Sequence, residues 1–160
     1  MARDVKMWKD DGSFKLRVCG VVKQDDKFLI SNCDNCEFYG FPGGHVSLGE
    51  NTDDAVIREV KEETLIETKI DKLLAIVQLF FKRDDGMPFH EICYYYLLTP
   101  KNDIKTENFD FQEDDKGTLR NHNFYWLKLE EFDQLDIRPS EMKDILQNNL
   151  ERQHIIKHQD

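Results

Sequence analysis

"GGHVSLGENTDDAVIREVKEET", residues 43–64, holds six carboxylates but only two Lys or Arg side chains. The stretch contains no proline, and no glycine follows Gly49, so a helix can begin where Asn51 or Thr52 caps it. At about 100° per residue, one face of that helix carries Glu59, Glu62 and Glu63. An adjoining arc is apolar and carries Val56, Ile57 and Val60. The stretch therefore predicts a helix with one packed face and one carboxylate face.

A solvated acidic surface is the simpler interpretation of this helix, but such a surface gains from Glu–Lys pairs four residues apart. Here Glu59 and Glu63 stand at that spacing and repel by roughly a few tenths of a kcal/mol. Crowded carboxylates cost stability unless a cation lies among them. Mg²⁺ takes oxygen ligands and often retains substrate phosphates as well. We therefore expect the cluster to hold metal and the metal to hold phosphate.

The glycines before the helix fit the same interpretation. Pro42 restricts the entry to the turn, and Gly43 and Gly44 allow the backbone to approach a ligand closely. A carbonyl of this turn can then point toward the metal. A tight structural turn explains the two glycines equally well.

The spacing of these residues resembles the Nudix box, the signature of the Nudix hydrolases. Gly44 is followed by five residues, Glu50, seven residues and the run Arg58-Glu59-Val60-Lys61-Glu62-Glu63. Every charged position of the box, which here covers residues 44–66, matches. One position departs, since Leu65 stands where the family has a glycine that commonly ends the helix. That departure leaves the shape of the following loop open.

The resemblance implies a Nudix-type α/β/α sandwich with a mixed β-sheet, formed by residues 1–160 as a single Nudix hydrolase domain. It also implies a pyrophosphohydrolase that uses Mg²⁺ or Mn²⁺ to cleave a phosphoanhydride bond in a nucleoside diphosphate linked to another group. The substrate is then a small-molecule nucleotide such as a nucleoside triphosphate, ADP-ribose or a nucleotide sugar. The alternative is a catalytically weak Nudix-fold module that binds a nucleotide or a protein. Loss of a box carboxylate would favour that alternative, and none is missing.

Residue roles follow from the same resemblance. The implied metal ligands are Gly44, through its carbonyl, Glu59, Glu62 and Glu63. Glu59 is also a candidate base, and Glu50 is expected to pair with Arg58 and orient the acidic face, or to approach the metal itself. Some family members place a base or an extra ligand outside the box. The acids that could serve here are Glu91, Glu107, Glu113, Asp114 and Asp115, and the sequence does not choose among them.

Composition limits the remaining possibilities. A chain of 160 residues that is 39% hydrophobic supports one sizeable core. The formal net charge of −10 argues against a nucleic-acid surface. No apolar segment approaches the roughly 20 residues that span a bilayer, and no targeting segment is evident, so we expect a cytoplasmic protein without a membrane partner. Whether the chain acts alone or as a homodimer stays open.

Strand-like runs at 14–22 and 27–31 predict one hairpin, and runs at 72–83 and 89–99 around "DDGMP" predict a second. Residues 101–123 are polar and acidic and predict an exposed loop with a short strand at 109–111. Residues 124–135 predict a short strand that runs into a helical turn. A C-terminal helix over 140–156 is expected, with Ser140 as its cap and apolar residues at Met142, Ile145, Leu146 and Leu150.

Four cysteines and several ring side chains carry weaker signals. Cys19 and Cys93 are expected to be buried, and Cys33 and Cys36 are expected to be reduced thiols, although their spacing also occurs in redox motifs. The histidines His154 and His158 are expected to be surface residues near a frayed helix end. His90 is expected at a strand start. Tyr94 and Tyr96 should share one strand face and Tyr95 the other, where part of the trio could stack on a base.

Overall fold

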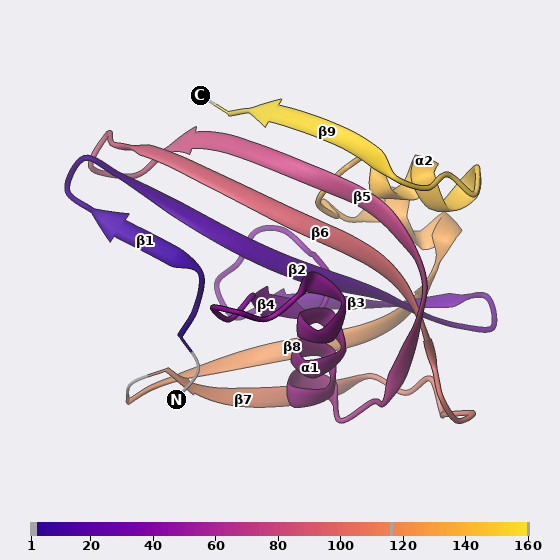
Figure 1. The fold of residues 1–160 in the computed structure, drawn as a ribbon. Coiled ribbons are helices and arrows are strands. Elements are labelled where there is room, and N and C mark those ends of the chain that lie inside the picture. The colour runs from indigo at the N-terminus through magenta and orange to yellow at the C-terminus, as the bar shows by residue number, and fades with distance from the viewer. Residues whose placement is uncertain (1–2, 116, 160) are drawn as a thin grey trace.

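The fold is described from a computed structural model, which covers residues 3–115 and 117–159 (Figure 1). Its elements in chain order are β1 (Lys6–Lys9), β2 (Gly12–Gln24), β3 (Lys27–Cys33), β4 (Gly43–His45), α1 (Thr52–Thr64), β5 (Thr68–Lys82), β6 (Pro88–Pro100), β7 (Phe109–Asp115), β8 (Thr118–Lys128), the 3₁₀ helix η1 (Leu129–Gln134), α2 (Met142–Gln147) and β9 (Gln153–His158). Within this described part, neither α-helix is long and apolar enough to cross a bilayer.

The strands form a mixed sheet in the order β7-β8-β3-β2-β6-β5-β9, with β1 and β4 also paired to β2. Two pairs are parallel, β2 with β6 and β5 with β9. The hairpins β2–β3 and β5–β6 confirm the two hairpins predicted from sequence. Because β4 pairs with β2 through the register Cys19↔Gly43, the glycine turn lies directly beside a central strand.

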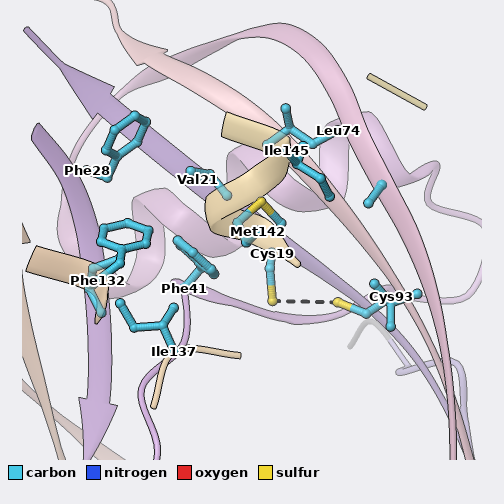
Figure 2. Packing of buried hydrophobic residues seen from close by; sticks show 13 residues of the cluster. Cys19, Val21, Phe28, Phe41, Leu74, Cys93, Phe132, Ile137, Met142 and Ile145 are labelled. Atoms are coloured by element: carbon cyan, nitrogen blue, oxygen red, sulfur yellow. Dashed lines mark hydrogen bonds between the residues drawn. The ribbon is translucent and has the colours of Figure 1, made fainter. Parts of the chain in front are cut away.

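Helices cover both faces of the sheet, so the predicted α/β/α sandwich with a mixed sheet is confirmed. α1 lies over one face, where Val56 and Val60 are fully buried against Val18 and Leu98 of the sheet. η1 and α2 lie over the other face, where Phe132, Met142 and Ile145 pack around Cys19 and Cys93 (Figure 2). The Sγ atoms of those two buried cysteines lie 3.6 Å apart, which confirms that both are core residues.

The start and end of α1 follow from two specific residues. Asn51 is the N-cap, and its side chain accepts a hydrogen bond of 2.8 Å from the backbone N–H of Asp54. Leu65 ends the helix in the left-handed region, with φ 60° and ψ 11°. Its N–H donates to the carbonyl of Lys61 at 2.9 Å, as in helices that end at a glycine. Leu65 therefore takes the conformation that the missing box glycine would take.

The prediction that residues 101–123 form mainly a loop is wrong. Residues 109–115 form β7, which pairs with β8 from Phe109↔Phe124 to Asp115↔Thr118. The alternation of apolar and acidic residues in "FDFQEDD" is short, and its net charge masks the strand pattern. Phe109 stacks on Phe124 with ring centroids 4.8 Å apart, so one apolar face is sufficient to fix this pair of strands.

The expected C-terminal helix over 140–156 is largely wrong as well. α2 covers only residues 142–147, its N-cap is Glu141 rather than Ser140, and that cap has no side-chain hydrogen bond. Residues 153–158 form β9, which pairs in parallel with β5. His154 and His158 thus lie on a strand, where His158 stacks on Phe80, and not at a frayed helix end.

The expectation of reduced thiols at Cys33 and Cys36 is also wrong for this structure, which pairs them in a disulfide. The turn that follows β3 brings their Cα atoms to 5.4 Å, within the range that a disulfide requires. The backbone N–H of Cys36 donates to the carbonyl of Cys33 at 3.0 Å and closes this turn.

Candidate active site

Arg58 of α1 connects the predicted acidic residues to one another. Its guanidinium group donates two hydrogen bonds to Glu50, of 2.8 and 2.9 Å. It also donates to Glu59 at 2.7 Å and to Glu62 at 3.3 Å. A further bond of 3.1 Å reaches the carbonyl of His45, which ties the helix to β4. The expected Glu50–Arg58 pair is present in the structure, and its hydrogen bonds hold the pKa of Glu50 below the ordinary value.

Glu59 lies against the backbone of Gly44. A Cβ atom at Gly44 would stand 2.2 Å from Oε2 of Glu59 and 2.4 Å from its Cδ. No residue larger than glycine can occupy this position unless the carboxylate moves. Burial raises the pKa of Glu59, and Arg58 opposes the shift. The glycine turn and the carboxylate face of α1 are therefore a single packed unit.

Glu63 lies beside the preceding glycine. Its Oε2 accepts a hydrogen bond of 3.1 Å from the backbone N–H of Gly43. Burial raises the pKa of Glu63 to about 8, and the Gly43 N–H only partly offsets this shift. The neighbouring Glu59 adds to it. A half-buried carboxylate that is costly to ionise is a group that a cation would stabilise.

The chemistry of these groups fits a hard divalent cation. Carboxylate oxygens and a glycine backbone are the ligand types that Mg²⁺ and Mn²⁺ accept. Among residues 3–115 and 117–159, however, no three His, Cys, Asp or Glu groups converge on one point as a ready metal cluster. Arg58 engages Glu59 and Glu62, and the Gly43 N–H engages Glu63. The structure thus places Gly44, Glu59, Glu62 and Glu63 in one region, with their carboxylates directed to protein donors.

The acids outside the box differ in their surroundings. Glu91 lies on β6, where its Oε1 is 4.0 Å from Nη1 of Arg17. Glu113 pairs with His122 at 3.2 Å, and Asp114 accepts from the N–H of Gly117. Glu107 is exposed in the loop before β7. The side chain of Asp115 lies outside the described residues. Of these acids, Glu91 is the one placed beside an arginine that acts on the box carboxylates.

Arg17 and His45 are site residues that the sequence did not single out. They are partners in the β2–β4 register, so both side chains lie beside the glycine turn. Burial raises the pKa of Glu59 and of Glu63, and the charge of Arg17 opposes both shifts. Burial and Arg17 together lower the pKa of His45 to about 4. The alternation in "FKLR" shows that Lys15 and Arg17 share a face, but only the β2–β4 pairing places that face at the site.

The ring side chains predicted as possible base contacts are mostly structural. Tyr96 is buried, and its hydroxyl lies 2.6 Å from Oγ1 of Thr52 at the start of α1. Tyr95 lies on the opposite face, edge-on to Phe41. His90 stacks on Phe80 with ring centroids 4.3 Å apart, and its Nε2 is buried without a hydrogen-bond partner among the described residues.

Comparison with known proteins gives a family match and several similar structures. The family model for the NUDIX domain matches residues 14–148. An ADP-ribose pyrophosphatase from Methanocaldococcus jannaschii is 36% identical over 99 residues, which are 60% of this chain and 57% of that protein. A mutator MutT protein from Bacillus halodurans has a similar structure, with TM-score 0.63 at 17% identity over 90% of this chain and 89% of that one. An ADP-ribose pyrophosphatase from Streptococcus suis gives TM-score 0.57 at 18% identity over 88% of this chain and 98% of that one. The two structural matches show the fold alone.

Proposed function

Because the chain belongs to the NUDIX family, we propose that it is a pyrophosphohydrolase that uses Mg²⁺ or Mn²⁺ to cleave a phosphoanhydride bond in a nucleoside diphosphate linked to another group. The observation that carries this proposal is the pair of half-buried carboxylates against the glycine turn, Glu59 at Gly44 and Glu63 at Gly43. Two half-buried acids held close together at an electrostatic cost are best explained by a cation that binds there.

The residues that would hold the cation are Gly44, Glu59, Glu62 and Glu63. When bound, a divalent ion neutralises the diphosphate and lowers the pKa of a water molecule. Arg58 holds Glu59 and Glu62 in position, and Glu50 fixes Arg58 through two hydrogen bonds. This arrangement sets the direction of the carboxylates before substrate arrives.

Glu59 is the proposed base. Its raised pKa makes it a better proton acceptor than an exposed glutamate, and its place against Gly44 keeps it beside the glycine turn. Water attacks phosphorus, its proton passes to Glu59, and the bridging P–O bond breaks. The products are a nucleoside monophosphate and the phosphorylated remainder, or pyrophosphate from a triphosphate cut at its inner bridge.

The proposed substrate is a small nucleotide, with ADP-ribose as the first compound to test and triphosphates and nucleotide sugars after it. The support is the relative named as an ADP-ribose pyrophosphatase, of which the match spans 57%. Residues 1–160 are proposed to form one domain that acts in the cytoplasm without a membrane partner. A chain with net charge −10 is a poor match for nucleic acid.

The test is a substrate panel with Mg²⁺ or Mn²⁺, comparing wild type with Glu62→Gln and Glu63→Gln. We expect wild type to hydrolyse at least one diphosphate derivative and both variants to lose most turnover. The matched control is Glu67→Gln, which removes an exposed carboxylate bound to Lys61 just beyond the helix. In ¹⁸O-labelled water, the label should appear on one phosphate product. Full activity in excess EDTA would refute the metal requirement. A wild-type protein that is inert toward the whole panel would favour the alternative, a Nudix-fold module that binds a nucleotide or a protein.

A further inference from the structure

One face of the sheet carries a row of cationic and aromatic side chains that leads away from the site. Along β2, residues 13, 15 and 17 point to the same face, and their parallel partners on β6 are residues 89, 91 and 93. β1 extends this face, because Trp8 pairs with Ser13. We call this surface the Arg17–Trp8 strip, and its members are Arg17, Lys15, Glu91, Ser13, Phe89 and Trp8. β1, β2 and β6 lie side by side in Figure 1.

The site end of the strip is cationic. The Arg17 side chain is 33% exposed, and its nearest carboxylate, Glu91, is 4.0 Å away. Lys15 has no carboxylate within 4.0 Å among the described residues, and its Nζ lies 5.3 Å above the ring of Phe89. Burial and the neighbouring Arg17 lower the pKa of Lys15. In a chain with net charge −10, two adjacent cations beside one glutamate form a surface complementary to an anion.

The far end of the strip is aromatic and held in place. Trp8 is 66% exposed although it is a large apolar residue. Arg83 lies over its ring at 4.7 Å and donates a hydrogen bond of 2.6 Å to Oγ of Ser13. Phe89 is buried beneath, edge-on to Trp8 at 6.4 Å and stacked on Phe81 at 4.2 Å. The indole of Trp8 is therefore an exposed ring that neighbouring side chains hold in place, as in proteins that stack nucleobases.

We propose that the Arg17–Trp8 strip binds the substrate, with Arg17 and Lys15 on the diphosphate and Trp8 on the nucleobase. This inference rests on the proposed function and narrows the class of substrate. From residue 17 to residue 13, β2 rises about 13 Å, a reach comparable to that of an extended nucleoside diphosphate. Arg17 pairs with His45, the residue that follows Gly44, so the cationic part begins beside the glycine turn. The aromatic part lies where the nucleoside would extend. The preferred substrate class is therefore one in which the nucleobase is retained beside the cleaved diphosphate.

A binding experiment in EDTA tests the strip without turnover. ADP and UDP are titrated into wild type and into Trp8→Leu, and the difference in tryptophan emission isolates Trp8 from the buried Trp126. We expect at least one nucleotide to change Trp8 emission, and inorganic pyrophosphate to compete without changing it. Lys15→Gln should raise Kd by about tenfold, the loss of one charge-assisted hydrogen bond. The matched control is Lys23→Gln. Lys23 lies on β2, like Lys15, but over the ring of Phe28 of β3, and its loss should leave Kd unchanged.

The outcomes separate this inference from the proposed function. The proposal that the strip binds substrate would be overturned by unchanged Trp8 emission with both nucleotides, or by equal Kd values for Lys15→Gln and Lys23→Gln. With a hydrolysed substrate, Lys15→Gln and Trp8→Leu should raise KM more than they lower kcat. Hydrolysis with unchanged KM in both variants would overturn the strip and leave the proposed function intact. A nucleotide that changes Trp8 emission in a protein that hydrolyses nothing would support the strip and contradict only the proposed function.

Discussion

Arg58 and Glu50, eight residues apart in the chain, are joined by two parallel hydrogen bonds of 2.8 and 2.9 Å. The same guanidinium group reaches Glu59 at 2.7 Å. Only the planar fork of arginine can hold two carboxylates in this way. Arg58 therefore acts through Glu59 and is a positioning residue.

The first prediction follows from that geometry. Arg58→Lys keeps the charge but removes the paired bonds, so we expect kcat to fall by about tenfold or more while KM changes little. The apparent affinity for Mg²⁺, read from the dependence of rate on its concentration, should also weaken. The control is Lys61→Arg, the reverse exchange on an exposed side of the same helix. Equal kcat values for both variants would contradict the positioning role.

The second prediction concerns the metal-free protein and pH. Burial raises the pKa of Glu63 from 4.5 to about 8, so between these values the folded state holds a proton that the unfolded chain has released. The free energy of unfolding should therefore fall as pH rises from about 4.5 to about 8, by at most about 1.4 kcal/mol per pH unit from this group. Denaturant unfolding in EDTA between pH 5 and 8 measures the slope.

Two variants identify the group responsible for that slope. Glu63→Gln should flatten it, and Glu67→Gln, which alters an exposed acid, should retain it. Millimolar Mg²⁺ at pH 8 should raise the free energy of unfolding of wild type and should change that of Glu63→Gln much less. Identical slopes in the two variants would show that Glu63 is already ionised in the folded protein.

The third prediction is steric. Gly44→Ala places a Cβ atom 2.2 Å from Oε2 of Glu59, so the carboxylate must move. We expect kcat to fall by about tenfold or more, with a smaller change in stability because Glu59 can rotate away. Gly40→Ala is the control, because the nearest atom that a Cβ there would meet beyond its chain neighbours is the carbonyl oxygen of Arg138, at 4.0 Å. Normal turnover by Gly44→Ala would show that the position of Glu59 against Gly44 is not needed for the reaction.

How much of this structure the sequence predicts depends on the range of the interactions. α1 was predictable because its cap, its apolar arc and its carboxylate face are all local, and the Asn51 cap is present. β9 was not, because the apolar spacing of Met142, Ile145 and Leu146 continues smoothly into "HII". What makes residues 153–158 a strand is parallel pairing with β5, a contact far away in sequence.

The same division holds within the site. The pairing of Arg58 with Glu50 follows from the box resemblance, and both residues are close in sequence. Arg17 reaches the site only because β4 pairs with β2, and no local pattern records that pairing. The disulfide depends likewise on the turn after β3, whose shape the polar loop sequence does not specify.

The last prediction concerns Leu65, whose φ of 60° is unfavourable for a residue with a Cβ atom. The left-handed region costs such a residue about 1–2 kcal/mol, whereas glycine adopts it freely and loses about 0.5–1 kcal/mol through chain entropy. Leu65 is 83% exposed, so few apolar contacts are lost on substitution. Leu65→Gly should therefore raise the free energy of unfolding by up to about 1 kcal/mol, or Tm by about 2–4 °C. Leu65→Ala keeps the unfavourable backbone and should not be stabilised, and the metal requirement should be the same in all three proteins. If thermal unfolding shows Leu65→Gly to be less stable than Leu65→Ala, the chain-entropy cost of glycine outweighs the cost of the left-handed backbone at this position.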